Sequence, residues 1–478
     1  MAYPMRPWAV RTVALLTAIC WLTCDLSAGD PNVPRFLAGR QTSPDNPVHP
    51  PEHWSATENV SWKTDLPGLG WSSPIVWDGR IYLTTCINTA PDRKPRKGLY
   101  LEDVDATKYP REKSVHSWKT VCLDLATGKI LWERVASEGI PSKPHHIKNT
   151  LASETPTIDG ERLYVLFGNL GLFCYDLDGK LLWTSPIPAR DTRYGWGTSM
   201  SPIVFGDRVY YADDNEENSS LFALDKRTGK PVWKVARKEK TNYSTPYIWE
   251  NPERTELVIS GINWVTSYDL SGKELWKIKG KSILSIPSPF ARDGLLYVTS
   301  GHVLWGKHRI YAIRPGAKGD ISPPDDDKDE KPTAIPKDPI DGKVLDPHIA
   351  WYRKIGPYHP TPLIVGDNLY MLFDRGILMC CDAKTGKLVF NKQRLAKGNA
   401  FTSSPWSYGD KLFCLNEDGV TCVVQTGPEF KSLHTNALAE DDMCMATPVI
   451  VGDKLLIRTS KRLYCVQSPT KGNTTAKN

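Results

Sequence analysis

Three segments of this 478-residue chain carry side chains that could hold a ligand. Imidazoles, a carboxylate and a guanidinium can bind polar groups, and an indole can stack on a sugar ring or a planar cofactor. The candidate ligand-binding residues are Trp71, His145, His146, Glu154, Arg193 and Trp196. The alternatives are structural: both tryptophans pack inside the fold and the histidine pair is solvated. We favour them, because tryptophan is usually buried and loop histidines are usually solvated.

No motif that would assign a catalytic residue accompanies these candidates. The sequence contains no nucleophile elbow, phosphate loop, HExxH or CxxC pattern. Adjacent residues such as His145 and His146 rarely both ligate one ion, and no further histidine follows at zinc-finger spacing. Residues 213–218 (DDNEEN) have the composition of a calcium loop but lack the central glycine and terminal glutamate of an EF-hand. We therefore predict no metal site, and the catalytic residues stay unassigned.

The first 28 residues have the pattern of a signal peptide. Arg6 and Arg11 provide a positive start, residues 13–22 are apolar, and Leu26-Ser27-Ala28 offers small residues for cleavage. Ten apolar residues are too few for a transmembrane helix, which needs roughly 20. We predict an exported protein, periplasmic, envelope-associated or secreted, with no transmembrane segment in the mature chain. Lipid attachment at Cys24 remains an alternative.

Composition limits the partners. A net charge of +6 over 478 residues gives no concentrated basic field, so nucleic acid is not expected as a partner.

Residues 29–58 are rich in proline and lack periodicity, which predicts an extended N-terminal arm. Residues 468–478 are polar and predict a disordered tail.

Residues 201–235 read as one unit of four short strands. A Ser-Pro pair opens the unit, Gly206-Asp207 forms a tight turn, and Asp225 to Lys230 forms a hairpin turn before Trp233. Similar units recur about every 43 residues, which is the range of β-propeller blades. Two longer intervals contain insertions at 87–117 and 315–348.

The count predicts an all-β, eight-bladed propeller of four antiparallel strands per blade over residues 59–467. The segment 59–65 (NVSWKTD) looks like a fourth strand without its first three, and the last unit has three strands without a fourth. We predict that the N-terminal strand completes the last blade and closes the ring, which removes two exposed sheet edges.

Aligned positions in the repeats make further predictions. We expect the fourth-strand aromatic of the seventh unit to be Phe430. A column of small third-strand residues explains five cysteines as core hydrophobes: Cys122, Cys174, Cys380, Cys422 and Cys465. Consecutive strand residues face opposite ways, so Cys380 and Cys381 should not form a disulfide. Cys86, Cys414 and Cys444 receive no role.

One face of the propeller should carry the function. Insertion 87–117 lies between strands two and three of the first blade, and the long loops 136–155 and 184–199 fall on the same face. Insertion 315–348 points to the opposite face and is charged and proline-rich in its core. Loops on a rigid scaffold commonly carry binding residues, so the decorated face is where we expect a ligand.

The repeat strings resemble a known family. LFCYDLDGKLLW (172–183), LFALDKRTGKPVW (221–233) and LMCCDAKTGKLVF (378–390) are similar to the PQQ-like β-propeller repeat. That family includes quinoprotein alcohol dehydrogenases and the outer-membrane assembly factor BamB, so the resemblance implies the fold but not one chemistry.

Three functions follow from the resemblance. The first is a binding or scaffolding module for a protein or cell-envelope ligand, which requires no cofactor and which we favour because no catalytic set can be carried over. The second is a dehydrogenase that uses PQQ and Ca²⁺ to oxidise alcohols or sugars. The third is a carbohydrate-binding propeller.

Overall fold

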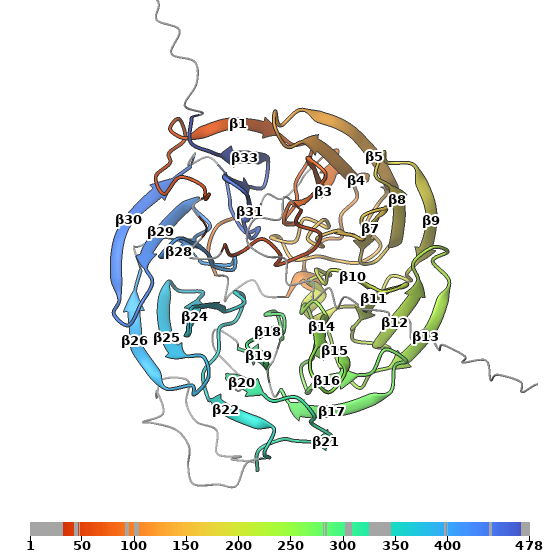
Figure 1. The fold of residues 1–478 in the computed structure, drawn as a ribbon. Coiled ribbons are helices and arrows are strands. Elements are labelled where there is room, and N and C mark those ends of the chain that lie inside the picture. Colours follow the sequence, from red (N-terminus) through yellow and green to blue (C-terminus); the bar gives the residue numbers. More distant parts are fainter. Residues whose placement is uncertain are drawn as a thin grey trace, which may run out of the picture.

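The protein is a closed ring of eight antiparallel sheets around a central axis (Figure 1). The predicted all-β, eight-bladed propeller is confirmed. The computed structural model describes residues 32–42, 46, 48–90, 95–99, 105–280, 282, 284–301, 308–324, 346–395, 398, 400–438 and 442–469. The predicted signal peptide and Cys24 lie outside the described residues, as does most of the predicted tail.

Each blade runs from an inner strand at the axis to an outer strand at the rim. Blades one and two contain β2 (Ile75–Trp77), β3 (Arg80–Asn88), β4 (His116–Asp124), β5 (Ile130–Gly139), then β6 (Thr157–Ile158), β7 (Arg162–Phe167), β8 (Gly171–Asp176), β9 (Leu181–Pro186). Blades three and four contain β10 (Ile203–Phe205), β11 (Arg208–Asp213), β12 (Ser220–Asp225), β13 (Pro231–Ala236), then β14 (Tyr247–Glu250), β15 (Thr255–Ser260), β16 (Trp264–Tyr268), β17 (Glu274–Lys279).

The second half of the ring follows the same order. Blades five and six contain β18 (Phe290–Arg292), β19 (Leu295–Ser300), β20 (Arg309–Ile313), β22 (Ile349–Arg353), then β23 (Leu363–Val365), β24 (Asn368–Phe373), β25 (Ile377–Asp382), β26 (Leu388–Arg394). Blades seven and eight contain β27 (Trp406–Tyr408), β28 (Lys411–Leu415), β29 (Val420–Gln425), β30 (Lys431–Ala437), then β31 (Val449–Val451), β32 (Lys454–Arg458), β33 (Arg462–Val466), β1 (Val60–Asp65).

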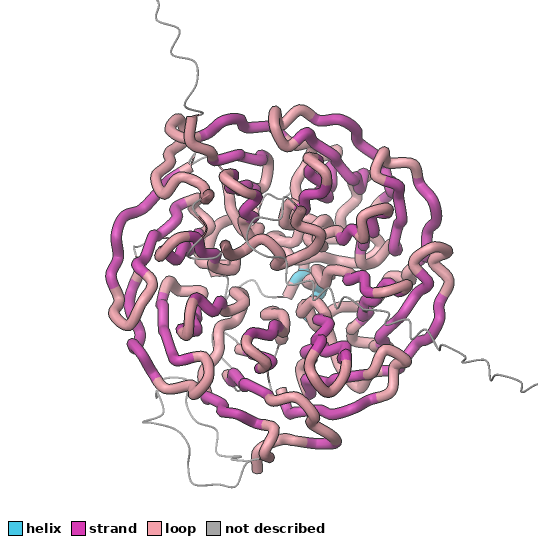
Figure 2. Tube along the Cα trace, viewed as in Figure 1, coloured by secondary structure: helices cyan, strands magenta, loops and turns pink. Residues whose placement is uncertain are grey.

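Helix is nearly absent from the described part of the chain. It is limited to two 3₁₀ turns, η1 (Ala106–Lys108) and η2 (Arg193–Gly195), which touch each other beside the axis (Figure 2). Neither is long and apolar enough to cross a membrane.

Burial follows the position of a strand in its blade. The second strand β7 is buried at five of six positions, because its two faces pack against neighbouring blades. The outer strand β9 alternates between exposed and half-buried residues, as expected for a strand with one face in water. Eight apolar clusters result, one between each pair of adjacent blades.

A tryptophan–glycine contact joins each of several blades to the next. Trp183, on the outer strand of blade two, lies against Gly229 in the hairpin turn of blade three and donates its indole N–H to Lys226 O at 3.2 Å. Gly229 has a φ of +69°, which favours glycine, and a Cβ there would overlap the indole ring. Asp225 holds this turn by accepting from the Thr228 amide and hydroxyl, and these bonds lower the pKa of its carboxyl.

The same contact closes the ring. β1 pairs antiparallel with β33, so residues from both ends of the propeller complete blade eight (Figure 1). Trp62 then packs on Gly128 of blade one and donates to Leu125 O at 3.2 Å. The predicted closure is therefore confirmed.

The described part of the N-terminal arm lies along the inner strands. Val33 bridges to Val76 of blade one, and Gln41 bridges to Ser407 of blade seven. Arg40 is buried and donates to Thr361 O at 3.0 Å and to Pro405 O at 3.4 Å. Burial lowers the pKa of its guanidinium to about 10. The arm thus fills space at the axis and ties blades on opposite sides of the closure to one another.

Two of the alignment predictions for blade seven are wrong. Val423 pairs with His434 at the register where other blades pair a small residue with an aromatic one, and Phe430 precedes β30. Cys422 pairs with Cys414 and faces blade six rather than blade eight. A shift of one residue reverses the face of every side chain in a strand, and the sequence of blade seven does not reveal that shift.

The other cysteine predictions agree with the structure. The nine cysteines of the described residues are buried and free of disulfides. Cys380 and Cys381 point into different inter-blade clusters, which confirms that strand geometry separates them. Of those without a predicted role, Cys86 lies between blades one and two and Cys444 between blades seven and eight.

Insertion 315–348 begins with a strand that the sequence did not predict. β21 (Gly319–Asp320) pairs in parallel with β17 and adds a fifth strand to the outer edge of blade four. Residues 325–345 of this insertion lie outside the described residues.

We expect Gly229→Ala to destabilise the ring far more than Gly206→Ala. Both glycines have positive φ, near +69° and +57°, so each alanine costs about 1–2 kcal/mol of backbone strain. Only the Cβ at position 229 meets an indole, whereas that at 206 meets open space, and overpacking adds about 1–3 kcal/mol. Urea denaturation midpoints of the two variants measure the difference. Equal midpoints would show that the tryptophan contact contributes little.

Candidate functional site

The three predicted loops come together on one face of the ring. Asn149 donates its side-chain amide to Trp196 O at 2.9 Å and to Thr198 O at 3.0 Å, which ties loop 136–155 to loop 184–199. Gly195 lies against Pro144 and Thr107, so η2 also contacts the insertion. At Gly195 φ is +64°, and a Cβ would meet the Pro144 ring at 2.8 Å.

Blade one extends beyond its neighbours to build a wall on this face. Its strands β3, β4 and β5 have nine, nine and ten residues, whereas middle and outer strands elsewhere have five to seven. Asn88 pairs with His116 and His116 with Gly139, so the sheet of blade one continues as far as the insertion. The described residues of the insertion, 87–90, 95–99 and 105–117, lie against that extension.

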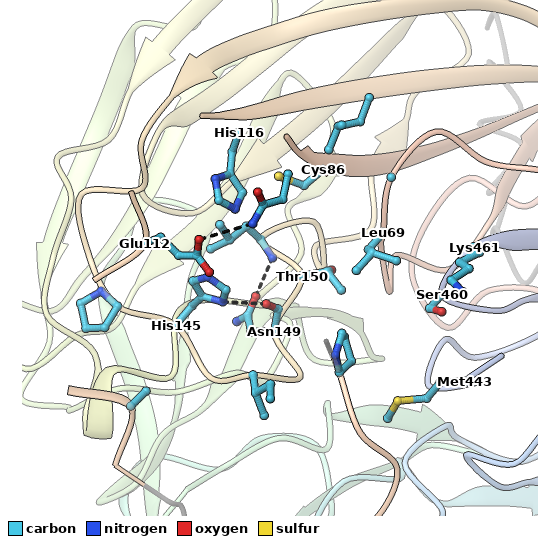
Figure 3. A pocket seen from close by; sticks show the side chains of 18 of the residues that line it. Leu69, Cys86, Glu112, His116, His145, Asn149, Thr150, Met443, Ser460 and Lys461 are labelled. Carbon is cyan, nitrogen blue, oxygen red and sulfur yellow. Dashed lines mark hydrogen bonds between the residues drawn. The ribbon is translucent and has the colours of Figure 1, made fainter. Parts of the chain in front are cut away.

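A cavity of about 470 Å³ lies between this wall, loop 136–155 and the loops of blade eight (Figure 3). A cavity of that size suits a small organic ligand. Its apolar surface is formed by Leu69, Ile87, Pro144, Ile147, Leu151 and Met443. Lys461 and Met443 lie across the cavity from Glu112 and His145.

Two histidines and a carboxylate form the polar end of the cavity. His145 Nδ1 lies 2.9 Å from Asn149 O, so the neutral ring carries its proton on Nδ1 and leaves Nε2 as an acceptor. Burial lowers the pKa of His145, although the nearby Glu112 carboxylate opposes this. Glu112 accepts from Ser114 Oγ at 3.0 Å and from Asn88 Nδ2 at 3.4 Å. The His116 ring lies 6.4 Å from that of His145, edge to face.

A buried ion pair fastens the cavity wall to blade seven. Lys148 Nζ donates to Glu417 of blade seven at 2.5 Å and to Gly98 O of the insertion at 3.0 Å. The Gly98 amide donates to the second Glu417 oxygen at 2.7 Å. Lys97 adds a pair with Asp418 at 3.6 Å. Two neighbouring carboxylates of blade seven, Glu417 and Asp418, therefore hold the insertion.

Glu417 belongs to a set of three acidic residues that follow the second strand of their blades, β28, β11 and β24. In blade three Asp214 pairs with Arg237, and in blade six Asp374 pairs with His359 Nδ1. Burial raises the pKa of Glu417, and the Lys148 ammonium opposes the rise. Each of the three carboxylates thus already has a cationic or imidazole partner within the protein.

The structure separates the six candidate ligand-binding residues. His145 alone among them lines the 470 Å³ cavity. Trp71 is buried behind it and donates its indole N–H to Lys148 O at 2.5 Å. Trp196 is half-buried and meets the His146 ring edge to face at 5.5 Å. The Arg193 guanidinium lies 5.4 Å from the centre of the Tyr194 ring.

Glu154 occupies a second, much smaller cavity between blades two and three. Its Oε1 accepts from Thr198 Oγ1 at 2.6 Å and from the Gly168 amide at 3.3 Å, while Oε2 has no hydrogen-bond partner among the described residues. Burial raises the pKa of this carboxyl. The cavity measures about 20 Å³, which suits one water molecule rather than a ligand.

Several residues of the large cavity were missed by the sequence analysis. Lys148 and Glu417 are 269 positions apart, and no local pattern connects them. Glu112 and His116 stand in the predicted insertion, four residues apart at the start of a strand, which was a usable signal. Lys461 lies in a short turn between β32 and β33 that looks like an ordinary exposed loop.

A calcium–quinone pair does not fit these residues. Within the described ranges no group of three or more His, Cys, Asp or Glu side chains is arranged to hold a metal ion. Glu417, the buried carboxylate nearest to the insertion, is neutralised by an ammonium where a divalent cation would need a bare oxygen. We therefore derive no catalytic step through such a group.

Comparison with known proteins agrees with the repeat pattern. Residues 117–248 match the family model of the outer membrane protein assembly factor BamB. BamB from Moraxella catarrhalis superposes with a TM-score of 0.53 and 11% identity over 87% of this chain and 98% of that one. The computationally designed Ika8 protein gives 0.50 and 9% over 84% and 98%. A quinohemoprotein alcohol dehydrogenase from Pseudomonas putida HK5 gives 0.49 and 12% over 91% and 81%. No curated protein matches in sequence.

We expect Lys148→Met to destabilise the protein in a pH-dependent way. Without the ammonium the pKa of the buried Glu417 rises further, so the folded state favours the protonated acid and stability is lost as pH increases from 5 to 8. Breaking a buried pair costs about 3–5 kcal/mol when the remaining group stays charged. Urea denaturation at both pH values measures this loss.

The control for Lys148→Met is the double variant with Glu417→Gln, which removes the buried charge. Its stability should not fall between pH 5 and 8 relative to the native protein. Hydrogen exchange at the Gly98 amide, which donates to Glu417, should accelerate in the single variant. An equal loss at both pH values would contradict the electrostatic role of the pair.

Proposed function

We propose that this chain, whose blades carry PQQ-like β-propeller repeats, is a binding module that holds a ligand on its loop-decorated face. The observation that carries the proposal is the 470 Å³ cavity between blades one and eight. Its wall is an insertion present in one blade only and fastened across the axis by Glu417. A regular propeller needs neither feature in order to fold.

Binding accounts for the arrangement better than catalysis. The lining of the cavity combines polar and apolar groups, which suits recognition of a ligand that carries both. Glu417, Asp214 and Asp374, which follow the second strands of their blades, each have a cationic or imidazole partner, so none of the three is poised as a free base beside the axis. The proposal requires no cofactor.

The cell envelope is the proposed location. The predicted signal peptide supports export, and the family model that matches residues 117–248 is that of an outer membrane protein assembly factor. We infer that the partner is a protein or an envelope ligand, reached through the loop-decorated face. The opposite face carries the tight turns between first and second strands, such as that at Asp207.

Site-specific photo-crosslinking tests this proposal. We expect p-benzoylphenylalanine at Lys461, beside the cavity, to give a discrete adduct in the native host after irradiation. The same residue at the exposed Asp207, on the opposite face, is the matched control and should give none. Mass spectrometry identifies the adduct, and the purified partner should reproduce it. Adducts from both positions alike, or none from position 461, would contradict the proposed face.

A second measurement separates binding from dehydrogenase activity. After incubation with PQQ and Ca²⁺ followed by gel filtration, we expect no quinone absorbance to accompany the protein, because the buried carboxylates of Glu417 and Asp214 have cationic partners within the protein. Dye-linked oxidation of alcohols and sugars should stay at background. Stoichiometric quinone retention with turnover would overturn the binding proposal in favour of the enzyme.

A further inference from the structure

We infer that the ligand of the 470 Å³ cavity is a small organic acid, whose carboxylate is attracted by the charges of Arg111 and Lys461 and whose apolar body fills the cavity. The inference rests on the proposed function and names the chemical class that this site would take. It follows from the charges that line the cavity, from one hydroxyl without a hydrogen-bond partner and from the segments that enclose the cavity.

The acidic residues of the cavity are already satisfied within the protein. Glu112 accepts from Ser114 and Asn88. Asp442 is fully buried, accepts from the hydroxyls of Thr459 and Ser460, and lies 4.0 Å from the Arg462 guanidinium. Neither carboxylate therefore needs a cationic ligand.

Two of the basic residues of the cavity, by contrast, have no partner among the described residues. Arg111 comes from the insertion of blade one and Lys461 from the loops of blade eight, and both are exposed cavity-lining residues. Within the described part of the chain neither side chain has an ion pair or a hydrogen bond. Lys97, the third lysine or arginine of the lining, is paired with Asp418. An anion entering the cavity would meet two cations that the protein leaves uncompensated.

A buried hydroxyl inside the cavity also lacks a partner. Thr150 is 8% exposed and lines the cavity, and its Oγ1 makes no hydrogen bond among the described residues. A buried polar group of this kind costs about 1–3 kcal/mol unless a ligand or water satisfies it. Thr150 and the open Nε2 of His145 therefore offer hydrogen bonds to a polar group of the ligand, beside the apolar surface.

The enclosure limits the ligand to a small molecule. The insertion lines the cavity on one side, and Glu417 holds it there through Gly98. The apolar side chains Leu69, Ile147 and Met443 would contact a hydrocarbon or aromatic body. A free carboxylic acid and the C-terminal carboxylate of a short apolar peptide share this chemistry.

A matched series of ligands tests the inference on the intact protein. We expect 4-phenylbutyrate to bind at least tenfold more tightly than 4-phenylbutanol in isothermal titration, and 4-phenylbutylamine to bind more weakly than the alcohol. The preference for the acid should shrink at high salt, because Arg111 and Lys461 are exposed. The N-acetylated dipeptide acid Leu-Phe and its amide form a second arm that distinguishes a free acid from a peptide terminus.

Variants assign the effect to residues. Arg111→Gln and Lys461→Gln should each lower affinity for 4-phenylbutyrate about five- to tenfold and leave affinity for the alcohol unchanged. Lys113→Gln removes an exposed charge of the same insertion outside the cavity lining and should have no effect. Thr150→Val should weaken acid binding without lowering the denaturation midpoint, because the hydroxyl has no partner in the protein.

The outcomes separate this inference from the proposed function. Equal affinity for acid and alcohol, or loss of acid binding in Lys113→Gln alone, would overturn the carboxylate assignment while the crosslinking result could still support a binding module. Failure of all three phenyl compounds and both dipeptides to bind would also overturn it. A crosslinked partner at position 461 that displaces 4-phenylbutyrate would support both.

Discussion

The contact between an outer-strand tryptophan and the glycine turn of the next blade is the constraint on which this ring depends. At Trp183 and Gly229 the indole lies where any side chain would collide, and its N–H satisfies a turn carbonyl. Where it occurs, the contact constrains how neighbouring blades sit, because the glycine turn must lie directly against the indole ring. Trp62 of β1 makes the same contact with blade one. The ring is therefore closed by the contact that also joins other pairs of neighbouring blades.

A ring held at its rim leaves the axial loops free to vary. Blade one uses this freedom most, since its strands continue past the others and end in the insertion. The insertion is then held in position by the buried carboxylate of Glu417, by the pair of Lys97 with Asp418 and by the contact of Thr107 with Gly195. Stability of the ring and geometry of the site are thus assigned to different interactions, so the site can change without loss of the fold.

The buried charges at the axis also belong to the interactions that stabilise the ring rather than to those that shape the site. Arg40 is surrounded by backbone carbonyls and satisfies groups that the inner strands leave unpaired. Glu417 and Asp214 each have a basic side-chain partner. Among the described lysines and arginines that line the cavity, Arg111 and Lys461 have no ion pair and stand on exposed loops. In this protein the charged side chains that could bind a ligand lie in the loops, whereas those near the axis are paired within the protein.

The sequence by itself determined the eight repeats, the closing strand around Trp62 and the face that carries the long loops, because strand periodicity, turn residues and loop lengths are local properties. It misplaced Cys422 and Phe430, since a one-residue register shift leaves no local trace. Of the six candidate residues, it placed one, His145, in the cavity. Only the tertiary structure decided the site, because Lys148, Glu417, Thr150 and Lys461 come together through ring closure, which joins blades far apart in the chain.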